Sequence, residues 1–359
     1  MAKLYDISEW SEQPWWNTGG TRNKKVYLNP EDGKLYYFKQ SFNKGQRNYE
    51  YEFWSEIIAS EVGKLLGFDL LEYHIAIRGN IIGCISESMI DPASEELVEG
   101  GKYLQALDNT FEPEDTKKRN RYDFQLIHKS LFAFGMGSHI KDITDIILFD
   151  SFIGNSDRHQ ENWAFINTHS NVSRSFSEMV DTLSKIEGKE DQIPSGIAKW
   201  LVKKFYMVKG KVRPEFKKAR LMFAKEKKFA PIYDSGCSFG RELKNKKVSS
   251  MLKNSSEIET YLDKGLAEIH WEREKINHFE LLKRILNEKE LKDQLLTTME
   301  RALKKFKIDK IEEMIKEVDN PLNQLRAKLG LPQDRKDLMI KLLALRRDRI
   351  QKLYQQYSK

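Results

Sequence analysis

One short segment combines residue types and a spacing that suit the transfer of a phosphoryl group. Residues 154–163 read GNSDRHQENW, after one apolar stretch and before another. An aspartate here can accept the proton of an attacking hydroxyl, and an asparagine five positions later can turn back to hold a magnesium ion. We therefore interpret Asp157 as a general base and Asn162 as a metal ligand.

Phosphoryl transfer also needs a cation on the phosphates and a further metal-binding carboxylate. Lys39 lies in an apolar strand pattern, where a lysine is costly unless it faces an anion, and Glu56 in the next helix pattern can pair with it. Asp234 ends another apolar pattern and precedes Ser-Gly, so we expect it to bind metal. Gly19 and Gly20 would let backbone amides approach phosphates closely.

Each of these residues also has an ordinary structural interpretation when it is taken alone. A Gly-Gly pair is usually a turn, a strand lysine can extend to solvent, and a helix glutamate is usually solvated. Asp157, Asn162 and Asp234 could cap loops or turns, and His159 could be a structural histidine. The chain order of Gly-rich turn, strand Lys, helix Glu, Asp-x4-Asn and strand-end Asp is far more demanding, so we favour a phosphotransferase site.

Hydrophobic periodicity predicts the elements that would position these residues. Strands are expected over 24–28, 34–39, 71–77, 80–85, 163–166 and 229–233. Helices are expected over 50–66, 122–134 and 140–153, and almost without interruption from residue 256 to the end. Residues 91–116 are acidic and are expected to form a loop.

Composition and charge exclude several classes of protein. The chain has 359 residues, of which 40% are hydrophobic, so it can form about two lobes and is not globally disordered. Two cysteines, Cys84 and Cys237, are too few for a disulfide scaffold or a Cys-rich zinc fold. We expect no secretory signal and no transmembrane segment. The expected location is the cytoplasm, with a secreted effector as the alternative.

The positive charge of the chain is concentrated in one segment. Lys199–Lys228 contains twelve Lys or Arg and two Glu, a local net charge of +10 compared with +7 for the whole chain. Interleaved aromatic and aliphatic residues indicate folded structure with a turn at 208–212. One interpretation is a packed insertion with solvated lysines. The other is an electrostatic dock for a partner that is an acidic protein, an RNA-associated protein or an anionic membrane surface.

The segment 154–163 resembles the catalytic loop of HipA-like serine/threonine kinases, whose Asp-Arg-His-x-x-Asn core the phosphatidylinositol kinases share. The short chain, which starts directly at the Gly-rich loop, is most similar to the CtkA-type and stand-alone HipT-type branch. The resemblance extends from about Gly19 to the last helix and is strong over 150–165 and 231–243. It implies a bilobal, protein-kinase-like α+β fold with an N-lobe over 1–88 and a helical C-lobe over 89–359.

The resemblance also implies an enzyme that uses ATP and Mg²⁺, and it suggests residue roles. Lys39 would hold the α- and β-phosphates with Glu56 as its partner, and Asp157 would be the base. Asn162 and Asp234 would bind the metal. The other residues that the resemblance places around the nucleotide are Gly19, Gly20, Thr21, Ile85, Ser86, Glu87, Ser88 and His159.

The sequence departs from the family pattern at one large feature and leaves several properties open. About 70 residues separate Asn162 from Asp234, often more than the family has, so 167–228 is expected to be an insertion. The resemblance suggests a protein substrate, which the sequence does not identify. It also suggests a toxin role with a cognate antitoxin, and autophosphorylation. The candidate acceptors are Thr18, Thr21, Ser249 and Ser250. A phosphoinositide kinase and a nucleic-acid-binding module that uses the basic insertion are the alternatives.

Overall fold

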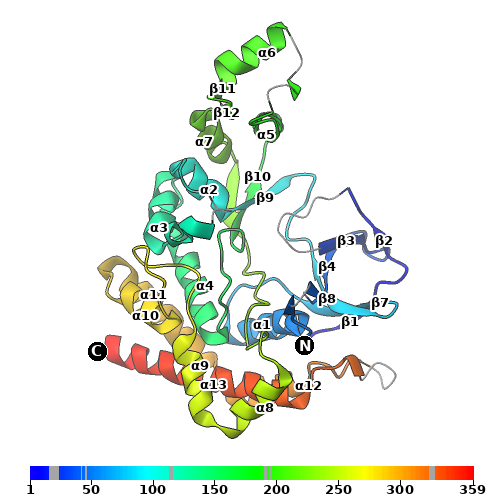
Figure 1. Cartoon of the computed structure of the whole chain (residues 1–359), viewed down its shortest axis with the longest axis vertical. Coiled ribbons are helices and arrows are strands. Elements are labelled where there is room, and N and C mark those ends of the chain that lie inside the picture. Colours follow the sequence, from blue (N-terminus) through cyan, green and yellow to red (C-terminus); the bar gives the residue numbers. More distant parts are fainter. Residues whose placement is uncertain are drawn as a thin grey trace. The chain divides into compact units, whose positions relative to one another are not determined.

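The computed structural model describes residues 1–15, 24–41, 43–44, 47–112, 116–189, 192–193, 196–322 and 328–359. The chain forms two compact units, each assembled from separate stretches (Figure 1). Unit 1 contains residues 1–89, 141–162 and 231–359, and unit 2 contains residues 90–140 and 163–230. These units are defined by their internal contacts, and the lobe limits 1–88 and 89–359 stay a prediction.

Unit 1 contains a six-stranded sheet in the order β1-β7-β8-β4-β3-β2. Its strands are β1 (Leu4–Asp6), β2 (Ser11–Glu12), β3 (Lys24–Leu28), β4 (Leu35–Lys39), β7 (His74–Arg78) and β8 (Ile81–Glu87). A separate short pair is formed by β5 (Asn43–Lys44) and β6 (Arg47–Asn48). The expected hairpin of β3 and β4 is confirmed, and its turn is closed by a 2.9 Å hydrogen bond from the Gly33 N–H to the Asn29 carbonyl.

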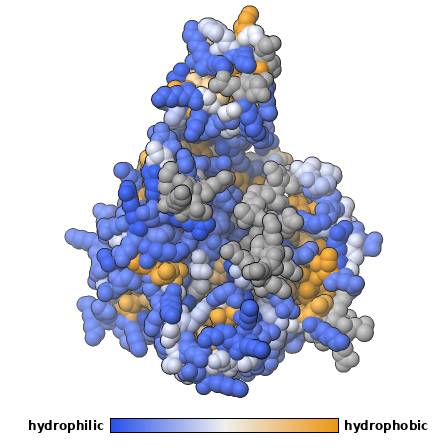
Figure 2. Space-filling model, viewed as in Figure 1, coloured by the Kyte–Doolittle hydropathy of each residue, from blue (hydrophilic) through white to orange (hydrophobic). Residues whose placement is uncertain are grey.

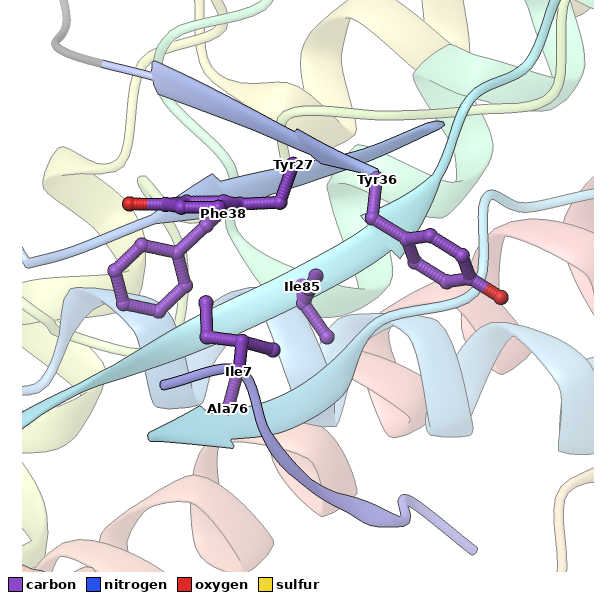
Figure 3. Close-up of a cluster of buried hydrophobic side chains, with 6 residues drawn as sticks. All are labelled: Ile7, Tyr27, Tyr36, Phe38, Ala76 and Ile85. Atoms are coloured by element: carbon purple, nitrogen blue, oxygen red, sulfur yellow. The ribbon is translucent and has the colours of Figure 1, made fainter. Parts of the chain in front are cut away.

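Strand alternation gives this sheet two chemically different faces. One face carries a buried cluster made of Ile7, Tyr27, Tyr36, Phe38, Ala76 and Ile85 (Figure 3). Because Phe38 enters this cluster, its neighbour Lys39 must point to the opposite face, where it meets α1 (Glu52–Leu66). The sheet therefore packs its aromatic side chains on one face and directs the predicted phosphate-binding lysine to the other.

Helix α1 is buried on nearly all sides, although its sequence contains three glutamates. The helix confirms the expected one over 50–66, and it ends at Gly67, whose φ of +81° is the left-handed conformation common after a helix. Glu52 and Glu56 are fully buried. Because a buried carboxylate needs a cation or hydrogen-bond donors, α1 requires polar partners from other segments.

The remaining helices of unit 1 include the one that leads into the predicted catalytic loop. They are α4 (Ile140–Ile153), α8 (Asn245–Lys253), α9 (Ser255–Lys264), α10 (His278–Leu286), α11 (Lys289–Lys305), α12 (Ile308–Glu317) and α13 (Gln333–Tyr357). Arg346 of α13 is buried and donates to the Ser151 carbonyl at 3.1 Å. A Cβ at Gly154, whose φ is +70°, would lie 2.5 Å from the same guanidinium. The long C-terminal helix thus supports the turn at which α4 ends and the loop begins.

Unit 2 contains a three-stranded sheet in the order β13-β10-β9. Its strands are β9 (Glu95–Glu99), β10 (Ala164–Thr168) and β13 (Glu226–Phe229), and its helices outside the insertion are α2 (Gly100–Leu107), η1 (Thr116–Arg121), α3 (Phe124–Ala133) and η2 (Gly137–His139). The expected loop over 91–116 is wrong where β9 and α2 form. Pairing with β10 outweighs the acidic composition of β9, and the Trp163 ring lies where a Cβ of Gly100 would be.

The expected insertion is folded and has a small core of its own. Its elements are α5 (Asn171–Lys185), α6 (Ile197–Leu201), the π-helix η4 (Val202–Tyr206), β11 (Met207–Val208), β12 (Lys211–Val212) and α7 (Pro214–Met222). Val180, Leu183 and Val212 are buried together. The expected turn over 208–212 is confirmed, with Lys209 and Gly210 both at positive φ. The expected strand over 229–233 is displaced, because β13 ends at Phe229.

Among the helices that the structure describes, none is long and apolar enough to cross a membrane.

Candidate active site

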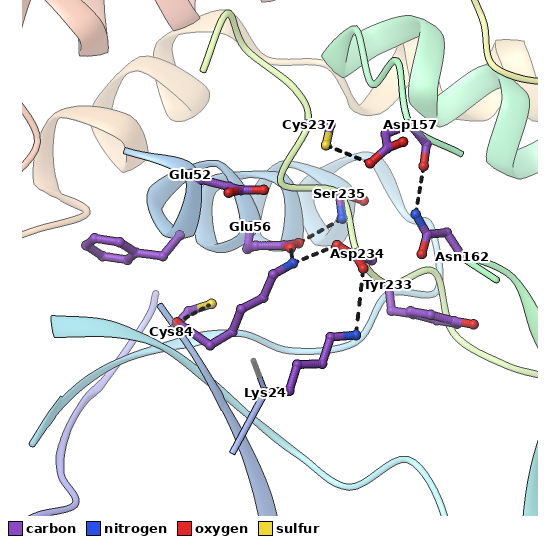
Figure 4. Close-up of polar contacts among 12 residues, drawn as sticks. Lys24, Glu52, Glu56, Cys84, Asp157, Asn162, Tyr233, Asp234, Ser235 and Cys237 are labelled. Carbon is purple, nitrogen blue, oxygen red and sulfur yellow. Dashed lines mark hydrogen bonds and ion pairs between the residues drawn. The ribbon is translucent and has the colours of Figure 1, made fainter. Parts of the chain in front are cut away.

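The centre of the site is a lysine that two carboxylates hold in place. Lys39, only 5% exposed, donates to Glu56 Oε1 of α1, and its Nζ lies 2.6 Å from Asp234 Oδ1 (Figure 4). The sequence places these residues 17 and 195 positions away from the lysine. A buried ammonium is stable only with such partners, so the position of its nitrogen is closely defined.

Glu56 also holds the backbone that follows Asp234. Its second oxygen, Oε2, accepts a 2.7 Å hydrogen bond from the Ser235 N–H. A Cβ at Gly236 would lie only 2.8 Å from Glu56 Oε1, so glycine allows this close approach of the Asp-Ser-Gly segment to α1. One turn earlier, Glu52 pairs with Arg241 at 3.4 Å. Helix α1 thus fixes both the lysine and the Asp-Ser-Gly segment through one glutamate.

Asp234 itself has an unusual backbone and a second cation. Its φ is +53°, a conformation that is costly for an aspartate, and its N–H lies 3.4 Å from the hydroxyl oxygen of Tyr73. Burial holds the pKa of the Tyr73 hydroxyl well above its usual value, so the group stays protonated. Lys24 Nζ lies 3.7 Å from Asp234 Oδ2.

Lys24 is a site residue that the sequence reasoning missed. The pairing of β3 with β4 places Lys24 directly opposite Lys39, so both side chains are on the same face of the sheet. The predicted hairpin already contained this signal, because its two strands could have been set in register. Two lysines side by side would repel each other, and Glu56 and Asp234 offset that repulsion.

The predicted catalytic loop is closed by hydrogen bonds between its own residues. Asn162 Nδ2 donates to the Asp157 carbonyl at 2.7 Å, an orientation that leaves the Asn162 amide oxygen to act as a ligand. Asp157 is half-buried, and its Oδ2 accepts from the Cys237 thiol at 3.1 Å. Arg241 in turn donates to Cys237 Sγ at 2.9 Å. The expected base and metal ligand therefore share one loop, and Cys237 joins it to the Asp-Ser-Gly segment.

Arg158 connects this loop to its surroundings. It is 1% exposed, and its Nε and Nη2 each lie 2.9 Å from one oxygen of Asp150 in α4. The same guanidinium donates to the backbone carbonyl of Asn162 at 2.8 Å and to Ser235 Oγ at 3.1 Å. Its bidentate pair with Asp150 fixes the loop to both α4 and the Asp-Ser-Gly segment.

The other expected nucleotide-binding residues differ in what the structure says of them. His159 Nδ1 accepts from the Glu161 N–H at 3.3 Å, so this ring helps to shape the loop. Ile85, Ser86 and Glu87 lie in β8, and the pairing of β8 with β7 begins at Ile85. On the edge of β8 that faces β7, the backbone beyond Ile85 pairs with no strand among the described residues, whereas Ser86 and Glu87 pair with β4 on the other edge. Gly19, Gly20, Thr21 and Thr18 lie outside the described residues.

The donor set of the site suits magnesium with a polyphosphate. Mg²⁺ prefers oxygen ligands and is often bound by one or two carboxylates together with substrate phosphates. Asp234 offers a carboxylate and Asn162 an amide oxygen, and Lys24 and Lys39 supply positive charge beside Asp234. Within the described part of the chain, no group of three or more His, Cys, Asp and Glu is arranged to hold a metal ion.

Comparison with known proteins bears on the fold. The structure is similar to the crystal structure of the Helicobacter pylori proinflammatory kinase CtkA, with a TM-score of 0.70 over 99% of this chain and 97% of that chain, at 16% sequence identity. It is also similar to a Shewanella oneidensis MR-1 complex of HipA, HipB and operator DNA, with a TM-score of 0.46 over 96% of this chain and 67% of that chain, at 14% identity. No protein-family model and no curated protein sequence matches the chain.

The chain therefore has a bilobal, kinase-like α+β fold. Among solved structures, that of CtkA shares this fold over nearly the whole of both chains. The fold class predicted from the sequence is confirmed, and so is the predicted resemblance to CtkA at the level of the fold.

Proposed function

We propose that the protein is a kinase that transfers the γ-phosphate of ATP to a Ser or Thr hydroxyl of a protein. The observation that carries this proposal is the buried Lys39 held by Glu56 and Asp234, next to a loop that joins Asp157 to Asn162. An isolated buried ion pair is a common structural feature. In protein kinases a strand lysine pairs with a helix glutamate and a nearby aspartate holds Mg²⁺, so the contacts of Lys39 with Glu56 and Asp234 support this function.

Each residue has a proposed role in that reaction. Lys39 and Lys24 would bind phosphate oxygens, and Glu56 would fix the direction of Lys39. Asn162 and Asp234 would hold Mg²⁺, which, when bound, supplies the charge that neutralises the phosphates. Asp157 would accept the proton of the attacking hydroxyl. The nucleotide contacts at Gly19, Gly20, Thr21, His159 and the backbone of 85–88 are proposals on the same basis.

The test measures phosphate transfer from labelled ATP with and without Mg²⁺, to protein substrates and to phosphoinositide vesicles. We expect labelled protein from the wild type, and about 10²- to 10⁴-fold slower transfer from Asp157→Ala, because a general base is lost. Asp293→Ala is the matched control, since Asp293 is an exposed aspartate of α11. Label only in the lipid would favour the phosphoinositide kinase, and equal rates for wild type and Asp157→Ala would reject the assignment.

Autophosphorylation is a finer part of the proposal, and the candidate acceptors differ in their surroundings. Ser249 Oγ donates to Asp334 at 2.6 Å, and Ser250 Oγ donates to Glu257 at 3.0 Å. A phosphate on either serine would repel its carboxylate and loosen the contacts of α8. We therefore propose Thr18 or Thr21 as the acceptor. Mass spectrometry after incubation with ATP decides it, because phosphate on Ser249 or Ser250 alone would contradict this choice.

A toxin role in the cytoplasm with a cognate antitoxin stays part of the proposal on the resemblance alone. Expression of the wild type should then arrest growth, and Asp157→Ala should relieve the arrest at the same protein level.

A further inference from the structure

Two groups of positive charges in the insertion differ in their surroundings. In the first group, Arg220 of α7 pairs with Glu96 and with Asp181, the latter at 2.7 Å, and Lys217 pairs with Glu187 at 2.8 Å. These cations hold α7 to β9, to α5 and to Glu187 just after α5, which is a structural task. They are therefore poor candidates for recognition of a partner, although they belong to the basic segment that the sequence indicated.

The second group lies at one end of the insertion, in residues 197–211, which we call the tip. The tip contains five lysines and no acidic residue. Its large exposed apolar side chains are Ile197 (78% exposed), Trp200 (54%), Leu201 (40%), Phe205 (51%) and Val208 (43%). Within unit 2, α6 lies at the end away from β9 and β10 (Figure 1), and Figure 2 shows hydrophobic surface there beside hydrophilic residues.

The tip is amphipathic, and its apolar residues are grouped. Ile197, Trp200 and Leu201 are spaced three and four apart, so they share one face of α6. The Trp200 and Phe205 rings meet edge to face at 6.3 Å, and Lys204 Nζ lies 4.5 Å from the Trp200 ring centre. Val202 and Tyr206 of the same segment pack against the core of the insertion. The exposed face is thus held in place by a buried one.

We propose that the tip docks on the surface of a bilayer that contains anionic phospholipids. Such a surface accepts aromatic and aliphatic side chains at the level of its headgroups, while neighbouring lysines reach its phosphates and carboxylates. Single-stranded RNA would use Trp200, Phe205 and the lysines. It would leave the aliphatic Ile197, Leu201 and Val208 in water, and these side chains favour the bilayer.

The experiment measures co-sedimentation of the full chain with vesicles of phosphatidylcholine alone and of phosphatidylcholine with phosphatidylserine. We expect binding to the mixed vesicles. This binding should weaken as the salt concentration rises from about 0.1 M to about 1 M, because the screening length falls from about 10 Å to about 3 Å. Lys204→Gln/Lys211→Gln should reduce partitioning about 30-fold. Trp200→Ala/Phe205→Ala should reduce it about 10- to 100-fold at every salt concentration.

Matched controls separate the tip from general charge and hydrophobicity. Lys218→Gln/Lys225→Gln removes two exposed lysines of the same insertion, and Phe132→Ala removes an exposed phenylalanine of α3. Both controls should bind vesicles as the wild type does, and all variants should phosphorylate a soluble substrate equally. Because binding needs no catalysis, a failure of the kinase proposal would leave this test intact.

Three outcomes would overturn the inference. The wild type could fail to sediment with the mixed vesicles, or the tip variants could bind as well as the controls. Tip-dependent binding of a single-stranded RNA oligonucleotide, without vesicle binding, would assign the tip to nucleic acid instead.

Discussion

The candidate active site and the tip of the insertion both depend on lysines, but they use them in opposite ways. Lys39 is buried between Glu56 and Asp234, and its position is fixed by both carboxylates. Lys204 and Lys211 are exposed, and no acidic residue lies within the tip sequence. A cation in the first environment has a defined direction, as group transfer requires. Cations in the second form a diffuse positive field, which suits an extended anionic surface.

The comparison separates charges that the fold depends on from charges that it does not. At the site, removal of one partner leaves an uncompensated buried charge, which is strongly destabilising. At the tip, Lys204 and Lys211 are exposed, so their removal leaves no charge buried and stability should hardly change. Stability and activity should therefore fall together at the site and be independent at the tip.

The largest effect is expected for Lys39→Met. This change leaves Glu56 and Asp234 buried without their common cation, so we expect a loss of about 3–5 kcal/mol in the free energy of unfolding together with loss of phosphate transfer. Adding Glu56→Leu should recover part of the stability and none of the activity. Urea denaturation of both single variants and the double variant measures the coupling, and additive losses would show that the two residues do not act as a pair.

Arg158→Met should come close to that effect on stability. Asp150 would lose its bidentate partner, and the Asn162 carbonyl and Ser235 hydroxyl would each lose a donor, at a cost of about 3 kcal/mol or more. The loop should also lose its position, so kcat should fall although Arg158 touches no reacting group in the proposal. Thermal unfolding and transfer rates check both parts, and Arg241→Met, at a less buried arginine, is the comparison. If the Arg158→Met variant were as stable as the wild type, the contacts of Arg158 would not be needed to keep the loop in position.

The local parts of the site could be predicted from the sequence, because each has a pattern within a few residues. The hairpin of β3 and β4, helix α1 and the Asp-x4-Asn loop follow from alternation, helical spacing and turn residues. The pairing of Lys39 with Glu56 was inferred from the cost of a buried lysine, and the structure places the two in contact. These inferences needed only the chemistry of single residues in short patterns.

The parts that could not be predicted depend on contacts between distant segments. Lys24 lies near Asp234 although 210 positions separate them, and Cys237 reaches Asp157 across 80 positions. Hydrophobic periodicity reports the structure of one segment and carries no information about contacts between distant segments. The missed β9 has a different cause, since its sequence EELVE is that of a solvated segment and pairing with β10 makes it a strand. In the insertion, composition indicated charge but could not separate Arg220, which is paired internally, from the lysines of the tip.

A smaller effect is expected for Gly236→Ala, which tests how closely the Asp-Ser-Gly segment must approach α1. The new methyl group would lie 2.8 Å from Glu56 Oε1 and 3.1 Å from Glu52 Cγ, so either the segment or the glutamate has to move. We expect a loss of about 1–3 kcal/mol in stability, and a larger relative loss of transfer because Glu56 also positions Lys39. Gly33→Ala is the control. The space around a Cβ at Gly33 is open and that turn lies outside the site, so any cost there reflects its positive φ alone.

The smallest effect on stability is expected at the tip, and it decides whether the comparison holds. Trp200→Ala/Phe205→Ala removes two rings that are more than half exposed and leaves Val202 and Tyr206 on the core of the insertion. Because substitutions at such surface positions usually stay within about 0.5 kcal/mol, we expect an unchanged unfolding midpoint. Thermal denaturation with and without mixed vesicles measures it. Vesicles should raise the midpoint of the wild type, because a ligand that binds the folded state stabilises it, and should leave that of the variant unchanged. A loss of several kcal/mol without vesicles would show that the exposed rings support the fold, and the tip would then resemble the site instead of contrasting with it.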